Sequence, residues 1–262
     1  MPSSSPDLWA LLLGAAAGLV CSFLNTVASS GSAVSLPILM MLGLDPISAN
    51  ATNRIPVLIG AASATASFHK SKAIPWNLAL RLGIPVTAGA ILGAALAEAI
   101  PARDLALLIT AALLLALLLL FTKLKQAIAS ATPGEVRFGL REIGLFFLIG
   151  IWLGFIVLDG ATYLLLALVL AVHLSLVAAN ALKNVALLPT TAAAMAIFAF
   201  KGSIDWSLGA AMALGSIAGG VLGARLAISA SAKKWVFRLL VTVITAELIH
   251  IGVHYVFASW QP

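Results

Sequence analysis

Two basic residues, Arg54 and Lys183, lie inside long apolar runs of this sequence. A charge is costly within a membrane-spanning segment, so a residue that carries one there is a candidate for function. The side chains near both are small amides and hydroxyls: Asn50, Thr52, Asn53, Asn180 and Asn184. Positive charge with such donors is what an oxyanion needs when it leaves water. The pattern predicts an oxyanion site; the alternative is that Lys183 neutralises Asp159 and Arg54 caps carbonyls at a helix break.

Two apolar runs, residues 33–44 and 161–174, are too short to cross a membrane. At about 1.5 Å per helical residue they reach only about 20 Å, whereas the hydrocarbon core is about 30 Å thick. The residues before them are small or polar: Asn25, Ser29, Ser30, Gly31 and Ser32 in one case, and Asp159, Gly160 and Thr162 in the other. We expect discontinuous or re-entrant second helices whose N-terminal N–H groups face the same anion. An ordinary turn at the membrane interface is the alternative.

The composition places these residues in a polytopic membrane bundle of helices. Of the 262 residues, 62% are hydrophobic and 9% charged, and the mean hydropathy is +1.11. Ten apolar segments are expected, at residues 8–24, 33–44, 47–68, 76–100, 104–121, 140–158, 161–174, 177–200, 206–227 and 235–257. Most of the other basic residues lie between these segments or near their ends rather than in a patch with aromatics, which excludes a nucleic-acid partner. The single cysteine, Cys21, excludes an intrachain disulfide and a cysteine-built metal site.

The two halves of the chain match each other when one is shifted by 130 residues. Trp76 then falls on Trp206 and Asn50 falls on Asn180. We predict a first membrane repeat at 1–122, a cytoplasmic linker at 123–139 and a second repeat at 140–262. Because each repeat holds five segments, an odd number, the second enters the membrane in the opposite orientation and the repeats are inverted.

The basic residues between segments predict the orientation. With the central linker in the cytoplasm, nine Lys and Arg residues lie in inside connections and two, Arg103 and Lys201, lie in outside ones. This asymmetry follows the positive-inside rule. It places both termini outside the cytoplasm, in a chain of the cytoplasmic (inner) membrane.

Two stretches resemble the signatures of a known family. NTVASSGSAVSLPILMMLGLDPISANATNR, at 25–54, and GFIVLDGATYLLLALVLAVHLSLVAANALKN, at 154–184, are similar to those of the TauE/SafE sulfite exporter family. The resemblance implies transport of sulfite, sulfonates or related small sulfur-containing anions across the cytoplasmic membrane. Family members commonly have a small or amide residue where this chain has Asp159. The acid there indicates proton coupling, a different substrate, or only a partner for Lys183.

The sequence therefore predicts an all-α secondary transporter that moves a small sulfur-containing oxyanion by alternating access. A passive anion channel is the closer alternative. An intramembrane enzyme is the more distant one, because the chain has no HExxH motif and Asp159 is its one well-placed intramembrane acid. The expected partners are the anionic substrate and the lipid bilayer; no cofactor and no metal site are expected, and the sequence does not predict an oligomeric state.

Overall fold

Helices make up every regular element that the structure describes. The computed structural model describes residues 7–101, 108, 136, 138–158 and 160–229. Within them the helices are α1 (Leu8–Ala28), α2 (Gly31–Met41), α3 (Pro46–Thr52), α4 (Arg54–Lys70), α5 (Trp76–Ala99), α8 (Leu140–Phe155), α9 (Gly160–Leu170), α10 (Leu176–Phe200) and α11 (Trp206–Ile228). The all-α prediction is confirmed for this part of the chain. The expected segments at 235–257 and, apart from Leu108, at 104–121 lie outside the described residues, as does most of the linker.

Four helices, α1, α5, α10 and α11, are long and apolar enough to cross a membrane. They have between 21 and 25 residues each, so at about 1.5 Å per residue every one reaches about 30 Å or more. The polytopic membrane class is confirmed at this level. Helices α2 and α9 are apolar too, but each has only 11 residues. At about 16 Å in length, they are the two short segments that the sequence predicted.

The third expected segment, 47–68, was wrong as a single helix. The chain forms α3 and α4 there, and the two meet at Asn53. Pro56 supplies the reason, since proline has no N–H to donate to the carbonyl four residues earlier, that of Thr52. Ala186 stands at the repeat-related position, and α10 runs through it without interruption. Arg54 consequently lies in the first turn of α4.

Local features of the backbone recur at the 130-residue spacing. Gly43 and His173, in the turns after α2 and α9, have φ angles of 95° and 63°. Lys72 and Gly202, in the turns after α4 and α10, have φ angles of 53° and 75°. These are left-handed conformations that few residues other than glycine adopt readily. The same turns therefore connect equivalent helices in both halves, even where only one half carries the glycine.

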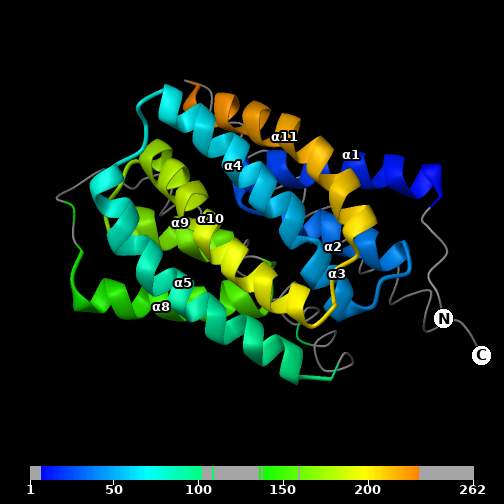
Figure 1. Ribbon diagram of the computed structural model, residues 1–262. Helices are drawn as coiled ribbons and strands as arrows, with labels where there is room; N and C mark the ends of the chain where they lie inside the picture. The colour runs from blue at the N-terminus through cyan, green and yellow to red at the C-terminus, as the bar shows by residue number, and fades with distance from the viewer. Residues whose placement is uncertain (1–6, 102–107, 109–135, 137, 159, 230–262) are drawn as a thin grey trace, which may run out of the picture.

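The halves also exchange helix contacts. Helix α1 packs along α11, and α8 packs along α5, so the first helix of each half lies against the helix of the fourth apolar segment of the other half (Figure 1). Glycine permits the close approach at both interfaces. A Cβ on Gly89 would collide with the Phe147 carbonyl oxygen, and a Cβ on Gly219 would collide with that of Leu19. Backbones that pack this closely are typical of membrane helices with small residues at the interface.

Candidate functional site

The two chain breaks before α2 and α9 lie against each other at the centre of the bundle. Helix α1 ends at Ala28, and Ser29 takes a left-handed conformation with φ of 62° before α2 starts. Helix α8 ends at Phe155, and α9 starts at Gly160. The hydroxyl of Thr162, in the first turn of α9, donates to the Ser29 carbonyl over 3.0 Å. The structure thus brings together the two polar segments that the sequence singled out.

Lys183, on α10, closes the C-terminal end of α1. Its side chain is fully buried, and Nζ donates to the Asn25 carbonyl at 2.6 Å and to the Ser29 Oγ at 2.9 Å. It also donates to Asn180 Oδ1 at 2.8 Å, and the Thr26 carbonyl lies at 3.4 Å. An ammonium group has three N–H donors. All of them are therefore engaged in this conformation.

Arg54, on α4, closes the C-terminal end of α8 in the same way. Its side chain is 1% exposed, Nη1 donates to the Leu153 carbonyl at 3.0 Å, and Nη2 donates to the Gly154 carbonyl. The guanidinium carbon lies 4.7 Å from the centre of the Phe198 ring, a cation–π contact. Its Nε is buried and has no hydrogen-bond partner. Arg54 therefore keeps a free donor, whereas Lys183 does not.

Each cation thus reaches from one half of the chain to the break in the other half. Arg54 does cap carbonyls at a helix break, as the alternative prediction held, and so does Lys183. Among the residues that the structure describes, no carboxylate lies within 4.0 Å of either cation. Asp159 lies outside those residues, and its pairing with Lys183 stays a prediction. The carbonyl end of a helix carries about half a negative charge, so each cation is only partly neutralised.

Two asparagines, Asn25 and Asn50, form hydrogen bonds with backbone groups at the chain breaks. Asn50 Nδ2 donates to the Phe155 carbonyl at 2.9 Å, and its Oδ1 accepts from the Val157 N–H at 3.0 Å. Asn25 Oδ1 accepts from the Gly31 N–H at 2.9 Å, at the start of α2. These two side chains fix the backbone on either side of a break and take the place of helical hydrogen bonds there.

Several buried donors at the same centre have no hydrogen-bond partner among the described residues. They include the hydroxyls of Ser30 and Ser32 and the amide nitrogens of Asn53 and Asn180. Unpaired buried donors are costly, because each loses its hydrogen bond to water. With the free Nε of Arg54 they make up an unused set of donors that suits an anion's oxygens.

The remaining predicted residues surround this centre in less direct roles. Asn184 Nδ2 donates to the Asn180 carbonyl one turn earlier on α10, and Thr52 Oγ1 accepts from the Asp205 N–H at the start of α11. Ser32, like Gly31, is buried in the first turn of α2, and Gly160 is buried at the start of α9. All the predicted residues within the described part are buried, except for the half-buried Thr162.

The sequence did not single out Cys21 and Ser35, which also belong to this centre. Ser35 Oγ donates to Asn53 Oδ1 at 2.6 Å and contacts Cys21 Sγ at 3.2 Å. Cys21 lies one helical turn before Asn25, and its thiol is 3.8 Å from Asn53 Oδ1. This helical spacing was the available signal. It was missed because Cys21 was considered only as a disulfide or metal ligand.

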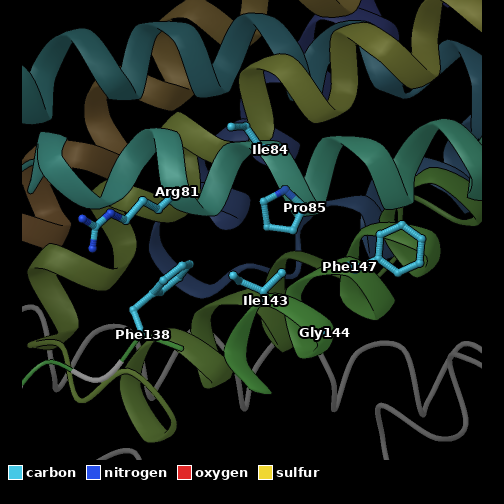
Figure 2. A pocket seen from close by; sticks show the side chains of 7 residues that line it. All are labelled: Arg81, Ile84, Pro85, Phe138, Ile143, Gly144 and Phe147. Atoms are coloured by element: carbon cyan, nitrogen blue, oxygen red, sulfur yellow. The ribbon is translucent and has the colours of Figure 1, made fainter. Parts of the chain in front are cut away.

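Two hollows in the described part of the chain lie away from this centre. One of about 730 Å³, between α5 and α8, is lined by Arg81, Ile84, Pro85, Phe138, Ile143, Gly144 and Phe147 (Figure 2). A second, of about 790 Å³, lies between α5 and α10, with Trp76, Thr87 and Pro189 in its wall. Neither is lined by a predicted site residue.

Long apolar helices around a buried polar centre define an integral membrane protein built to handle a polar solute inside a bilayer. The family model of the sulfite exporter TauE/SafE matches residues 14–249. The chain belongs to this family and is a membrane transporter of the TauE/SafE type.

Curated relatives agree with this class. A probable membrane transporter protein of Haemophilus influenzae is 29% identical over 93% of this chain and 95% of its own. The probable membrane transporter protein ORF9 of a Sinorhizobium species is 27% identical over 83% of each chain. The probable membrane transporter protein YfcA of Escherichia coli is 26% identical over 91% of this chain and 88% of its own. No solved structure matches the chain significantly.

Proposed function

We propose that this chain is a secondary transporter that moves a small sulfur-containing oxyanion, such as sulfite or a sulfonate, across the cytoplasmic membrane by alternating access. One observation carries the proposal. Two fully buried cations cap two adjacent chain breaks, one cation at each break, with no carboxylate within 4.0 Å among the described residues. A centre of net positive charge inside an apolar bundle favours an anionic ligand. The family supplies the chemical class of that ligand.

Arg54 is the cation that contacts the substrate in this proposal. Its Nε is free, and the unpaired Ser30 hydroxyl and Asn53 and Asn180 amides complete the donor set. A planar guanidinium with amide and hydroxyl donors suits the oxygens of a sulfite or sulfonate group. Lys183 adds positive charge while its N–H groups hold the end of α1. The first turn of α2 contributes the partial positive charge of a helix N-terminus.

Two inverted repeats would surround this site. The exchange of helices between the halves, with α1 along α11 and α8 along α5, supports such a pseudo-two-fold arrangement. So does the pair of cations, each of which closes the first helix of the opposite half. In this arrangement both termini lie outside the cytoplasm, and the linker at 123–139 lies inside.

Asp159 is proposed as the proton-coupling group. It immediately precedes Gly160, the first residue of α9. An acid next to a helix N-terminus would change charge with the local proton activity. Transport would then take its energy from the proton gradient.

The test is a thermal-stability screen of the purified protein against sulfite, sulfate, thiosulfate, sulfoacetate and taurine. A ligand that binds only the folded state stabilises it by about 2.7 kcal/mol at a hundredfold excess over its Kd. We expect one of these sulfur anions to do so, and to move into proteoliposomes against its own gradient when a proton gradient is imposed. Flux that only dissipates the anion gradient would identify a passive channel. If none of the compounds stabilised the protein or moved across the membrane, the proposal would be wrong.

A further inference from the structure

Two small apolar clusters lie at opposite ends of the described bundle. The first, here called the Phe198 cluster, consists of Ala51, Ile55, Ala94, Ala97, Ala194, Phe198 and Ile204. The second, here called the Phe68 cluster, consists of Ala64, Phe68, Ile74, Ala181, Ala224 and Ala227. The helices that carry each cluster end close together. In Figure 1, α4 and α11 end together at the upper left, and α5 and α10 end at the lower right.

The two clusters are copies of each other. A shift of 130 residues places Phe68 on Phe198, Ile74 on Ile204, and each alanine of one cluster on an alanine of the other. Ile55 falls on Val185, which packs, partly buried, against the Phe68 cluster. Fully buried residues thus recur at both ends, at repeat-related positions.

Each cluster is built by both halves of the chain. The Phe198 cluster takes the ends of α3 and α5 and the start of α4 from the first half, and its phenylalanine from α10 of the second. In the Phe68 cluster the second half supplies the start of α10 and the end of α11, and the first half supplies the phenylalanine, from α4. A movement of one half against the other must therefore separate one cluster or the other. A packed apolar constriction excludes water and ions while it is closed.

The polar centre lies between the two clusters. Ile55 of the Phe198 cluster directly follows Arg54, and Ala181 of the Phe68 cluster lies two residues before Lys183. Along α4, Arg54 and Phe68 are about 21 Å apart at about 1.5 Å per residue. A solute bound at the chain breaks therefore has one apolar cluster on each side.

We propose that the two clusters are the two gates of the transport cycle. The inference rests on the proposed function. In the orientation given above, the Phe198 cluster closes the outer path to the anion site and the Phe68 cluster closes the inner path. The structure has both clusters packed and represents the occluded state.

The gates differ in one respect. The guanidinium of Arg54 lies over the Phe198 ring, whereas no cation lies over the Phe68 ring among the described residues. The group that we propose to contact the substrate thus also contacts the outer gate. An anion that draws Arg54 away from the ring weakens the outer gate and leaves the inner one unchanged.

Cys21 is a natural reporter for this proposal. It is the only cysteine of the chain, it is fully buried, and its thiol lies beside Asn53 in the polar centre. The experiment measures the rate at which a charged, membrane-impermeant thiol reagent modifies Cys21 in right-side-out and in inside-out vesicles. We expect Phe198→Ala to raise the rate at least about tenfold in right-side-out vesicles only, since a shift of about 1.4 kcal/mol in the gate equilibrium has that effect. Phe68→Ala should raise it in inside-out vesicles only.

The two variants control for each other, because they remove the same side chain at repeat-related positions. Where an alanine variant fails to fold, Phe198→Leu and Phe68→Leu keep most of the buried volume and should show the same sidedness with smaller increases. Opposite sidedness in either orientation supports the two gates; the reversed pattern corrects only the assignment of the sides. Increases on the same side for both variants, or no increase in folded protein, would overturn the proposal. Because the assay contains no substrate, such a failure would leave the anion-binding test of the proposed function intact.

Discussion

The replacement of Arg54 by glutamine tests the proposed anion site most directly. Glutamine removes the charge and the free Nε, and it cannot reach both carbonyls at the end of α8 that Arg54 now holds. The variant therefore changes both the stability of the protein and its affinity for the substrate. The two effects are measured separately.

The stability effect follows from the contacts. Two hydrogen bonds from a charged donor contribute about 1.5 to 3 kcal/mol each, and the contact with the Phe198 ring contributes about 0.5 to 2 kcal/mol. The glutamine amide can restore one of the two carbonyl contacts. We expect a net loss of about 2 to 5 kcal/mol in the free energy of unfolding, which leaves a domain of ordinary stability folded.

The effect on affinity covers a similar range of free energy. Loss of a buried charged contact to a ligand weakens binding by about 2 to 5 kcal/mol, which is at least about thirtyfold in Kd. Arg54→Lys keeps the charge but not the planar pair of donors, so it should bind weakly. The assay is calorimetry or thermal shift on monodisperse protein with the sulfur anion that stabilises the wild type most.

The matched control is the double change Lys183→Gln with Asp159→Asn, which removes the equivalent cap without leaving an unpaired acid. If the affinity loss came only from a loosened chain break, both variants would lose affinity alike. We expect Arg54→Gln to lose more, because Lys183 has no free donor. Unchanged affinity in folded Arg54→Gln protein would refute the anion site and the main structural argument for an anionic substrate.

Three further results are expected. Asn50→Ala should lower the unfolding free energy by about 2 to 5 kcal/mol, because it leaves the Phe155 carbonyl and the Val157 N–H without partners. Asn180→Ala, at the repeat-related position, should destabilise the protein less. Equal chemical-denaturation midpoints for the two variants would contradict this. Asp159→Asn should flatten the pH dependence of anion flux, and a wild-type pH profile in the variant would rule out proton coupling through this residue. In a Cys21→Ser background, a cysteine at Gln261 should react with an impermeant maleimide in intact cells and one at Ser130 should not; labelling at Ser130 alone would reverse the orientation.

The long helices and the short ones could be predicted from the sequence, because a bilayer imposes a fixed length on apolar runs. The segment at 33–44 was expected to be too short to span a membrane, and α2 has only 11 residues. The interruption at Asn53 was missed although Pro56 lies within the run, because the run is apolar enough overall to form one spanning segment. A hydropathy value carries no information on the backbone N–H that a proline lacks.

The residues of the centre could be predicted, but not what each one does. Arg54 and Lys183 stood out because charge is rare within apolar segments. Their carbonyl partners could not be predicted, since every residue has a carbonyl and only the fold determines which ones face a cation. Cys21 and Ser35 were missed for a related reason, because small side chains are common in membrane helices and become informative only when Asn53 lies beside them.

The exchange of caps between the halves has a consequence for biogenesis. The Asn25 carbonyl accepts a hydrogen bond from a residue 158 positions later, and the Arg54 guanidinium donates to a carbonyl 99 positions later. While the ribosome is still making the second half, the first half enters the membrane with an open helix end and an unpartnered cation. Such groups are unfavourable in hydrocarbon. The first half cannot complete its folding before the second half is made. Either half expressed alone should be degraded by membrane quality control, whereas two halves expressed together as separate chains should assemble into a folded protein.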